Sequence, residues 1–359
     1  MITDKEIQAA LERVASRAPD PSRVRAGLDA RARVHRQRRA LLVAGGAVAT
    51  ASVLGLPAAA LWLDTAGQDA AGAPDDVPVE PDVRTAPNLG AAMPEPAAAP
   101  GNLRIPLRYR PTWLPEGYVE ASREASLRGG APDYQVREWM RAEDAATMPD
   151  GNHDRAPFVR LMLVSASEWP IGDWRLPVTV NGVAGGLSPK EGQTPQVVWP
   201  VAEGLQLATM VQGVGDDSLV AQWVARSVEA DSVTAVDSPL DFGWLPDSIQ
   251  GSHRIAVSYP AETWTATLSV IRDRQQVAGA VLGPAVTAPS ADGSPASVRG
   301  RQGLVHSFDT GGGWAYVELA QGMRLAVTVM QPTSREELLR VIAELKIGTT
   351  PYLGWLGRR

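Results

Sequence analysis

The chain has 359 residues, a formal net charge of −6 and no cysteine. Its length exceeds the usual size of one domain, which predicts two domains with connecting segments. The lack of cysteine excludes a disulfide framework, a thiolate nucleophile and any zinc or iron–sulfur site with cysteine ligands.

The N-terminal segment is basic although the whole chain is acidic. Residues 1–39 carry ten basic and five acidic side chains, so the rest of the chain carries a net charge of about −11. Thr3 and Glu6 have the spacing of a helix capping box, and a second helix is expected from about Ser22 to Arg39. We predict a basic helical cytoplasmic head. It either docks a cytoplasmic regulatory partner or lies on anionic lipid headgroups.

Residues 40–63 contain no charged side chain, and 24 apolar or small residues are enough for a transmembrane helix. Acidic residues follow the segment, and a cluster of arginines precedes it: Arg31, Arg33, Arg36, Arg38 and Arg39. The positive-inside rule therefore predicts a single-pass protein of the cell membrane, with the N-terminus in the cytoplasm and the C-terminal domains outside.

The alternative is a cleaved export signal. Arg38-Arg39 before an apolar run resembles a twin-arginine signal, and Ala58-Ala59-Ala60 offers a cleavage site. We favour the uncleaved anchor, because the arginine pair lacks the flanking residues typical of that signal. Residues 64–102 follow with seven Pro, ten Ala and seven acids, a composition that predicts a disordered linker acting as a spacer.

The remaining chain repeats itself. Trp113-Leu114-Pro115 recurs as Trp244-Leu245-Pro246, and Val180-Asn181-Gly182 with Gly185 recurs as Val298-Arg299-Gly300 with Gly303. The stretch Gly204-Leu205-Gln206-Leu207-Ala208 recurs as Gly322-Met323-Arg324-Leu325-Ala326. Matching features in the same order indicate a duplicated module. We predict extracytoplasmic modules at 103–233 and 238–350.

Each module is expected to contain short antiparallel strands and to end in an amphipathic helix. The expected strands are Arg160–Ser167, Val178–Val180, Gln196–Val201, Leu205–Gln212, His253–Tyr259, Trp264–Arg272, Leu304–Asp309, Trp314–Leu319 and Met323–Met330. The first closing helix follows Asp216-Asp217, and the second follows a capping box of Thr333 and Glu336. The predicted fold class is α+β: a transmembrane helix, then two repeated modules, each an antiparallel sheet covered by a C-terminal helix.

This organisation resembles the extracytoplasmic domains of anti-sigma-like, single-pass bacterial membrane proteins of the DUF4367 type. The resemblance rests on Pro111 to Tyr118, on Val180 to Gly182, on Trp199, Gly204 and Leu205, and on the closing helix. It implies a sensing or interaction domain tethered to one helix. Zinc-binding heads of anti-sigma proteins use His and Cys ligands, whereas this head has only His35, which argues against that mode of sigma-factor binding.

Few residues suggest chemistry. His153 lies among carboxylates, and we prefer a solvated loop there to a metal site. His306 is interpreted as a structural strand residue, and Asp216-Asp217 as a helix cap rather than a catalytic dyad.

Trp113 and Trp244 are expected in the core rather than on a ligand platform. We therefore assign no catalytic, cofactor-binding or metal residue and expect no cofactor.

The sequence predicts a membrane-anchored extracytoplasmic sensory or regulatory binding protein that is not an enzyme. Its expected partners are the lipid bilayer, an envelope protein or ligand outside, and a regulatory partner in the cytoplasm; nucleic acid is not expected. The alternative is an exported envelope structural or lipid-associated binding protein, whose N-terminal segment is only a cleaved signal.

Overall fold

The computed structural model describes residues 95–97, 100–128, 131–147, 156–167, 176–188, 194–258, 261–273, 275–290 and 292–358. The expected head, the expected membrane segment and most of the expected linker lie outside these ranges. Within them, no helix is both long enough and apolar enough to cross a bilayer.

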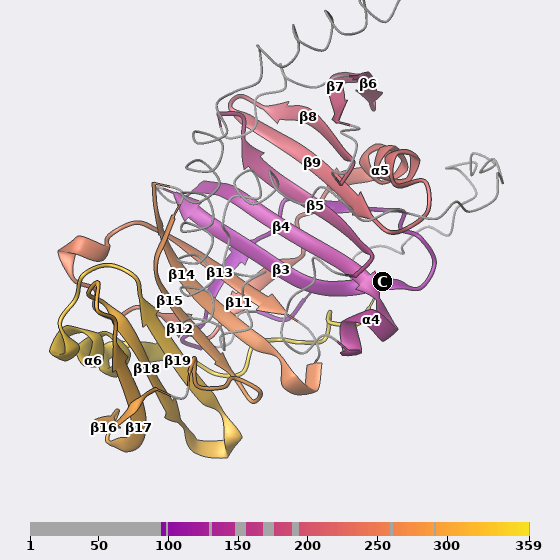
Figure 1. The fold of residues 1–359 in the computed structure, drawn as a ribbon. Helices are drawn as coiled ribbons and strands as arrows, with labels where there is room; N and C mark the ends of the chain where they lie inside the picture. The colour runs from indigo at the N-terminus through magenta and orange to yellow at the C-terminus, as the bar shows by residue number, and fades with distance from the viewer. Residues whose placement is uncertain are drawn as a thin grey trace, which may run out of the picture. The chain divides into compact units, whose positions relative to one another are not determined.

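A single antiparallel sheet of 14 strands dominates the described residues (Figure 1). Its order is β16-β17-β18-β19-β15-β14-β13-β3-β4-β5-β9-β8-β7-β6. The first half contains β3 (Tyr118–Arg128), β4 (Ala131–Arg141), β5 (Phe158–Ser165), β6 (Leu176–Val180), β7 (Val183–Ser188), β8 (Gln196–Ala202) and β9 (Leu205–Gln212). The second contains β13 (Ser252–Ser258), β14 (Thr265–Arg272), β15 (Gln275–Gly283), β16 (Ser294–Val298), β17 (Arg301–Ser307), β18 (Gly313–Glu318) and β19 (Arg324–Val329).

The two halves have the same internal strand order and meet at the β3–β13 pair. The recurring motifs show which residues of β9 and β19 are equivalent. The registers of the neighbouring strand pairs then extend this equivalence to the other strands of each half. In the first half, the register partners on β9, β5, β4 and β3 are Leu207, Leu163, Gln135 and Ala125. In the second half, the partners on β19, β15, β14 and β13 are Leu325, Leu282, Ala266 and Val257. Glu124 is therefore equivalent to Ala256, and these two residues face each other across the junction.

Short ladders close each half. β2 (Tyr109–Pro111) pairs with β10 (Val228–Ala230), and β12 (Leu240–Asp241) pairs with β20 (Lys346–Ile347), so the start and end of each half lie together. β1 (Leu103–Pro106) pairs with β11 (Ala235–Ser238) and joins the beginning of one half to that of the other.

One closing helix packs on each half of the sheet. α5 (Asp217–Arg226) contacts β8 and β9, whereas α6 (Arg335–Glu344) contacts β18 and β19. Asp216 caps α5, as the sequence predicted. The capping box of α6 consists of Ser334 and Glu337, one residue later than predicted, because the helix begins at Arg335.

The fold class is mainly β rather than the expected α+β. The described helices are short, and a third one, α4 (Ala142–Thr147), adds only six residues. Several strands were not predicted, above all β3 and β4, because their buried positions carry Glu and Arg rather than Val or Ile. β9 matches its predicted bounds.

The recurring turns and glycines have clear structural roles. Asn181-Gly182 and Arg299-Gly300 make two-residue hairpin turns with positive φ at both positions. Gly185 and Gly303 lie against a neighbouring strand: a Cβ on either would sit 2.4 Å from the carbonyl oxygen of Val198 or Tyr316. The duplication therefore preserved residues that the backbone geometry requires.

Candidate functional site

The densest cluster of charge in the described residues is a chain of buried ion pairs, which we call the ion chain. Arg123 Nη1 lies 2.5 Å from Glu95 Oε1, and Arg123 Nη2 lies 2.9 Å from Glu120 Oε2. Arg137 Nε lies 2.7 Å from Glu120 Oε1, and Arg137 Nη1 lies 2.8 Å from Asp231 Oδ2. All five side chains are buried.

Separate segments contribute to the ion chain. Glu120 and Arg123 lie on β3, and Arg137 is the register partner of Arg123 on β4. Asp231 follows β10, where its carboxylate also accepts hydrogen bonds from the backbone N–H groups of Val233 and Thr234. Glu95 lies inside the segment expected to act as a spacer.

Electrostatics keep the ion chain charged. Burial alone would raise the pKa of Glu120, but Arg123 and Arg137 outweigh burial and hold that pKa below its usual value. Burial likewise opposes ionisation of Asp231, yet hydrogen bonds from Thr234 and Val233 together with Arg137 lower its pKa. Both carboxylates are therefore ionised at neutral pH.

The C-terminal residues cover the ion chain. The ring centroid of Trp355 lies 4.2 Å from Arg123 Cζ, an arrangement typical of a cation–π contact. The Glu120 backbone N–H donates to the carbonyl of Arg358 at 2.7 Å, and the Gly357 N–H donates to the carbonyl of Glu120 at 3.0 Å. The end of the second half thus holds the first strand of the first half.

The ion chain has no counterpart in the second half. The positions equivalent to Arg123 and Arg137 are Ile255 and Leu268, which belong to a hydrophobic core. The fold can therefore be built with apolar residues at these positions, and the charges are an addition specific to the first half.

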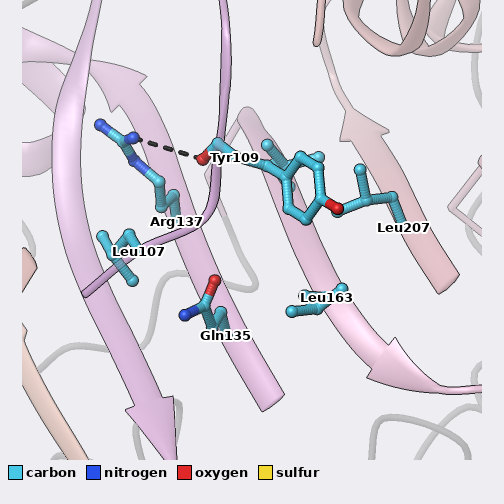
Figure 2. Close-up of a pocket in the computed structure, with 7 residues that line it drawn as sticks. Leu107, Tyr109, Gln135, Arg137, Leu163 and Leu207 are labelled. Atoms are coloured by element: carbon cyan, nitrogen blue, oxygen red, sulfur yellow. Dashed lines mark hydrogen bonds between the residues drawn. The ribbon is translucent and has the colours of Figure 1, made fainter. Parts of the chain in front are cut away.

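A small cavity adjoins Arg137 (Figure 2). Its volume of about 10 Å³ gives room for no more than one water molecule. Arg137 Nη1 donates to the carbonyl of Tyr109 at 3.4 Å, and Gln135 Nε2 donates to the carbonyl of Pro106 at 2.6 Å. The groups of the ion chain therefore bind one another and the backbone. We call this role, in which buried ion pairs hold the strands in place, a structural lock.

A second charged cluster lies on the opposite face of β3, because neighbouring strand residues point to opposite faces. Arg254 Nε on β13 lies 3.3 Å from Glu124 Oε1, and Arg254 Cζ lies 3.7 Å from the ring centroid of Tyr134. Arg160 Nε donates to Glu138 Oε2 at 2.7 Å. Burial raises the pKa of Glu124 to about 7; Arg254 and Arg160 oppose this rise, and Glu138 adds to it.

An open hollow of about 350 Å³ lies over β17 and β18, lined by Gln302, Gly303, Leu304, Tyr316 and Glu318. The hollow is shallow and open to solvent, and its lining combines an aromatic ring with polar side chains. The hydroxyl of Tyr316 donates to Glu318 Oε1 at 3.4 Å.

The two described histidines, His253 and His306, make separate ring contacts. His35 and His153 lie outside the described residues. His306 stacks on Trp314 with ring centroids 5.9 Å apart, in agreement with a structural role, and His253 packs edge-on against Phe242. Within the described ranges, no group of three or more His, Asp or Glu side chains could hold a metal ion.

Most of the described tryptophans are buried, whereas Trp113 and Trp244, which were predicted in the core, are partly buried and pack against its edge. Trp139, Trp199, Trp223, Trp264, Trp314 and Trp355 are all buried. Trp113 packs against Trp223 of α5, with ring centroids 5.6 Å apart, and Trp244 lies beneath Arg340 of α6 at 4.0 Å. The recurring Trp-Leu-Pro motif thus anchors the start of each half to its closing helix. Trp62, Trp169 and Trp174 lie outside the described residues.

Sequence reasoning missed both charged clusters. The available signal was a pair of neighbouring segments, 118–128 and 131–141, in which acids and arginines stand among Ala, Val and Trp residues. No protein-family model and no curated protein matches this sequence.

Proposed function

We propose that this protein is a membrane-anchored extracytoplasmic binding protein with a sensory or regulatory role and no enzymatic activity. Residues 1–39 stay in the cytoplasm, residues 40–63 span the cell membrane, and residues 64–102 connect them to the duplicated domain outside. The observation that carries the proposal is the uncharged 24-residue segment between a cluster of arginines and an acidic stretch.

The described geometry supports binding rather than chemistry. In the ion chain, Arg123 and Arg137 are each held by two carboxylates, so these groups serve to fix the strands in place. The cavity beside them is too small for a substrate. The open hollow over β17 and β18 offers an exposed surface on which an envelope partner or ligand could be recognised.

The anchor predicts that the mature protein keeps its N-terminus. Intact-mass measurement of the full-length protein from the membrane fraction should show a chain beginning at Met1 or Ile2. A variant in which Ala58 and Ala60 are replaced by Leu, which removes the cleavage site, should have the same N-terminus. A mature chain beginning at Leu61 would instead support the exported protein with a cleaved signal.

The regulatory role predicts a cytoplasmic partner that binds residues 1–39. Deletion of residues 2–35, which keeps Arg36, Arg38 and Arg39 before Ala40 to preserve insertion, should abolish co-purification of that partner and leave the membrane fraction of the protein unchanged. Equal recovery of the partner with and without the head would contradict this role.

A further inference from the structure

Glu124 occupies a special position in the sheet. It lies in β3, where its partner Ala256 in β13 is also its equivalent in the duplicated half. The pair therefore lies at the centre of the junction, through which the two halves of the 14-stranded sheet are hydrogen-bonded. Because the second half has a methyl group there, the fold does not require a carboxyl group at this position.

Charged groups surround Glu124 from three neighbouring strands. β13 contributes Arg254, β4 contributes Glu138, and β5 contributes Arg160, which is paired with Glu138. Glu124 is 8% exposed, and its Oε1 lies 3.3 Å from Arg254 Nε. Burial and the nearby Glu138 disfavour the ionised carboxylate, whereas Arg254 and Arg160 favour it; burial has the largest effect.

We propose that the β3–β13 junction is a proton-controlled joint: Glu124 takes up a proton as the medium becomes more acidic than neutral, and the two halves are held more firmly in that state than when Glu124 is ionised. The joint is a property of the described strands. It therefore holds in whichever compartment they lie, and a failure of the anchor test would leave it standing.

The direction of the pH effect follows from the linkage between proton binding by Glu124 and folding stability. Burial raises the pKa of Glu124 in the folded protein to about 7, from 4.5 in the unfolded chain. The folded state thus binds the proton more tightly, and the stability gained is fully present below pH 4.5 and is lost as the pH rises through about 7. His253 acts in the opposite direction, because burial lowers its pKa, with Asp241 partly offsetting this effect.

The test is amide hydrogen exchange on the full-length chain at pH 5 and pH 8, comparing the wild type with Glu124→Gln. In the wild type, protection factors of the β3–β13 amides should fall on the order of tenfold to a hundredfold between pH 5 and pH 8. Glu124→Gln preserves the volume of the side chain and should remove that fall. Comparing the two proteins cancels the contribution of His253.

Two further variants sharpen the test. Glu138→Gln removes the acid that disfavours the carboxylate, so the midpoint of the fall should shift to lower pH. Arg254→Gln removes the nearest cation, so the midpoint should shift to higher pH. General loosening of the junction would not shift the midpoint in opposite directions.

Three results would overturn the proposal. Protection of the wild-type junction could be independent of pH, or Glu124→Gln could show the same fall as the wild type. Alternatively, the β8–β9 amides could lose protection more steeply than those of β3–β13, which would place the pH-sensitive group away from the joint.

Discussion

Arg137→Leu should lower the free energy of unfolding by about 3–5 kcal/mol, measured by urea unfolding of the full-length chain at pH 7. The substitution places in the first half the residue type that the second half has at Leu268. It nevertheless destabilises the protein, because Asp231 and Glu120 remain buried and lose a shared cation.

The matched control for this variant is Arg110→Leu. Arg110 also pairs with an acid across a ladder, but its partner Glu229 has a side chain that is 47% exposed. Loss of that pair should cost less than about 1 kcal/mol. Adding Glu120→Gln and Asp231→Asn to Arg137→Leu should restore part of the lost stability, since the uncompensated charges are then removed. Equal costs for Arg137→Leu and Arg110→Leu would show that the ion chain is not a structural lock.

Trp223→Ala should lower the free energy of unfolding by about 3–5 kcal/mol, and Ile342→Ala by about 2–5 kcal/mol. Both side chains are buried between a closing helix and its half of the sheet, and Trp223 also packs edge-on against Trp113. Thermal and urea unfolding monitored by circular dichroism measure both effects.

The exposed residue Arg340 of α6 provides the control. Its ion pair with Glu344 and its contact with Trp244 predict a loss of about 1 kcal/mol or less for Arg340→Ala. If Trp223→Ala were as mild as Arg340→Ala, the tryptophan would not be a core residue, and its role as an exposed recognition residue would have to be reconsidered.

Repetition made much of the fold predictable. The strand Leu205–Gln212 and the two closing helices follow from patterns with a fixed geometric meaning. One detail of the expected alignment was wrong. The spacing of apolar residues in the sequence predicts that Trp223 and Ile342 are core residues at equivalent places in the closing helices, but both helices span ten residues at a constant offset of 118. Trp223 therefore matches Val341, and Val224 matches Ile342.

The central strands β3 and β4 were not predicted, because they carry charged residues at buried positions. β3 and β4 place Glu120, Arg123 and Arg137 at buried positions, where an alternating hydrophobic pattern would predict apolar residues. The partners of these side chains are distant in sequence: Glu95, Asp231 and the C-terminal Trp355. A local pattern carries no information about such distant pairings, so the charged segments 118–128 and 131–141 could indicate buried charge but not the partners of those side chains.

The central claim of a membrane protein with its duplicated domain outside can be tested by one labelling measurement, because the chain contains no cysteine. Thr310→Cys places a thiol at an exposed turn between β17 and β18, and Ser16→Cys places one in the basic head. A membrane-impermeant maleimide added to intact cells should label Thr310→Cys and should label Ser16→Cys only after lysis. Labelling of Ser16→Cys in intact cells, or protection of Thr310→Cys until lysis, would contradict the proposed orientation.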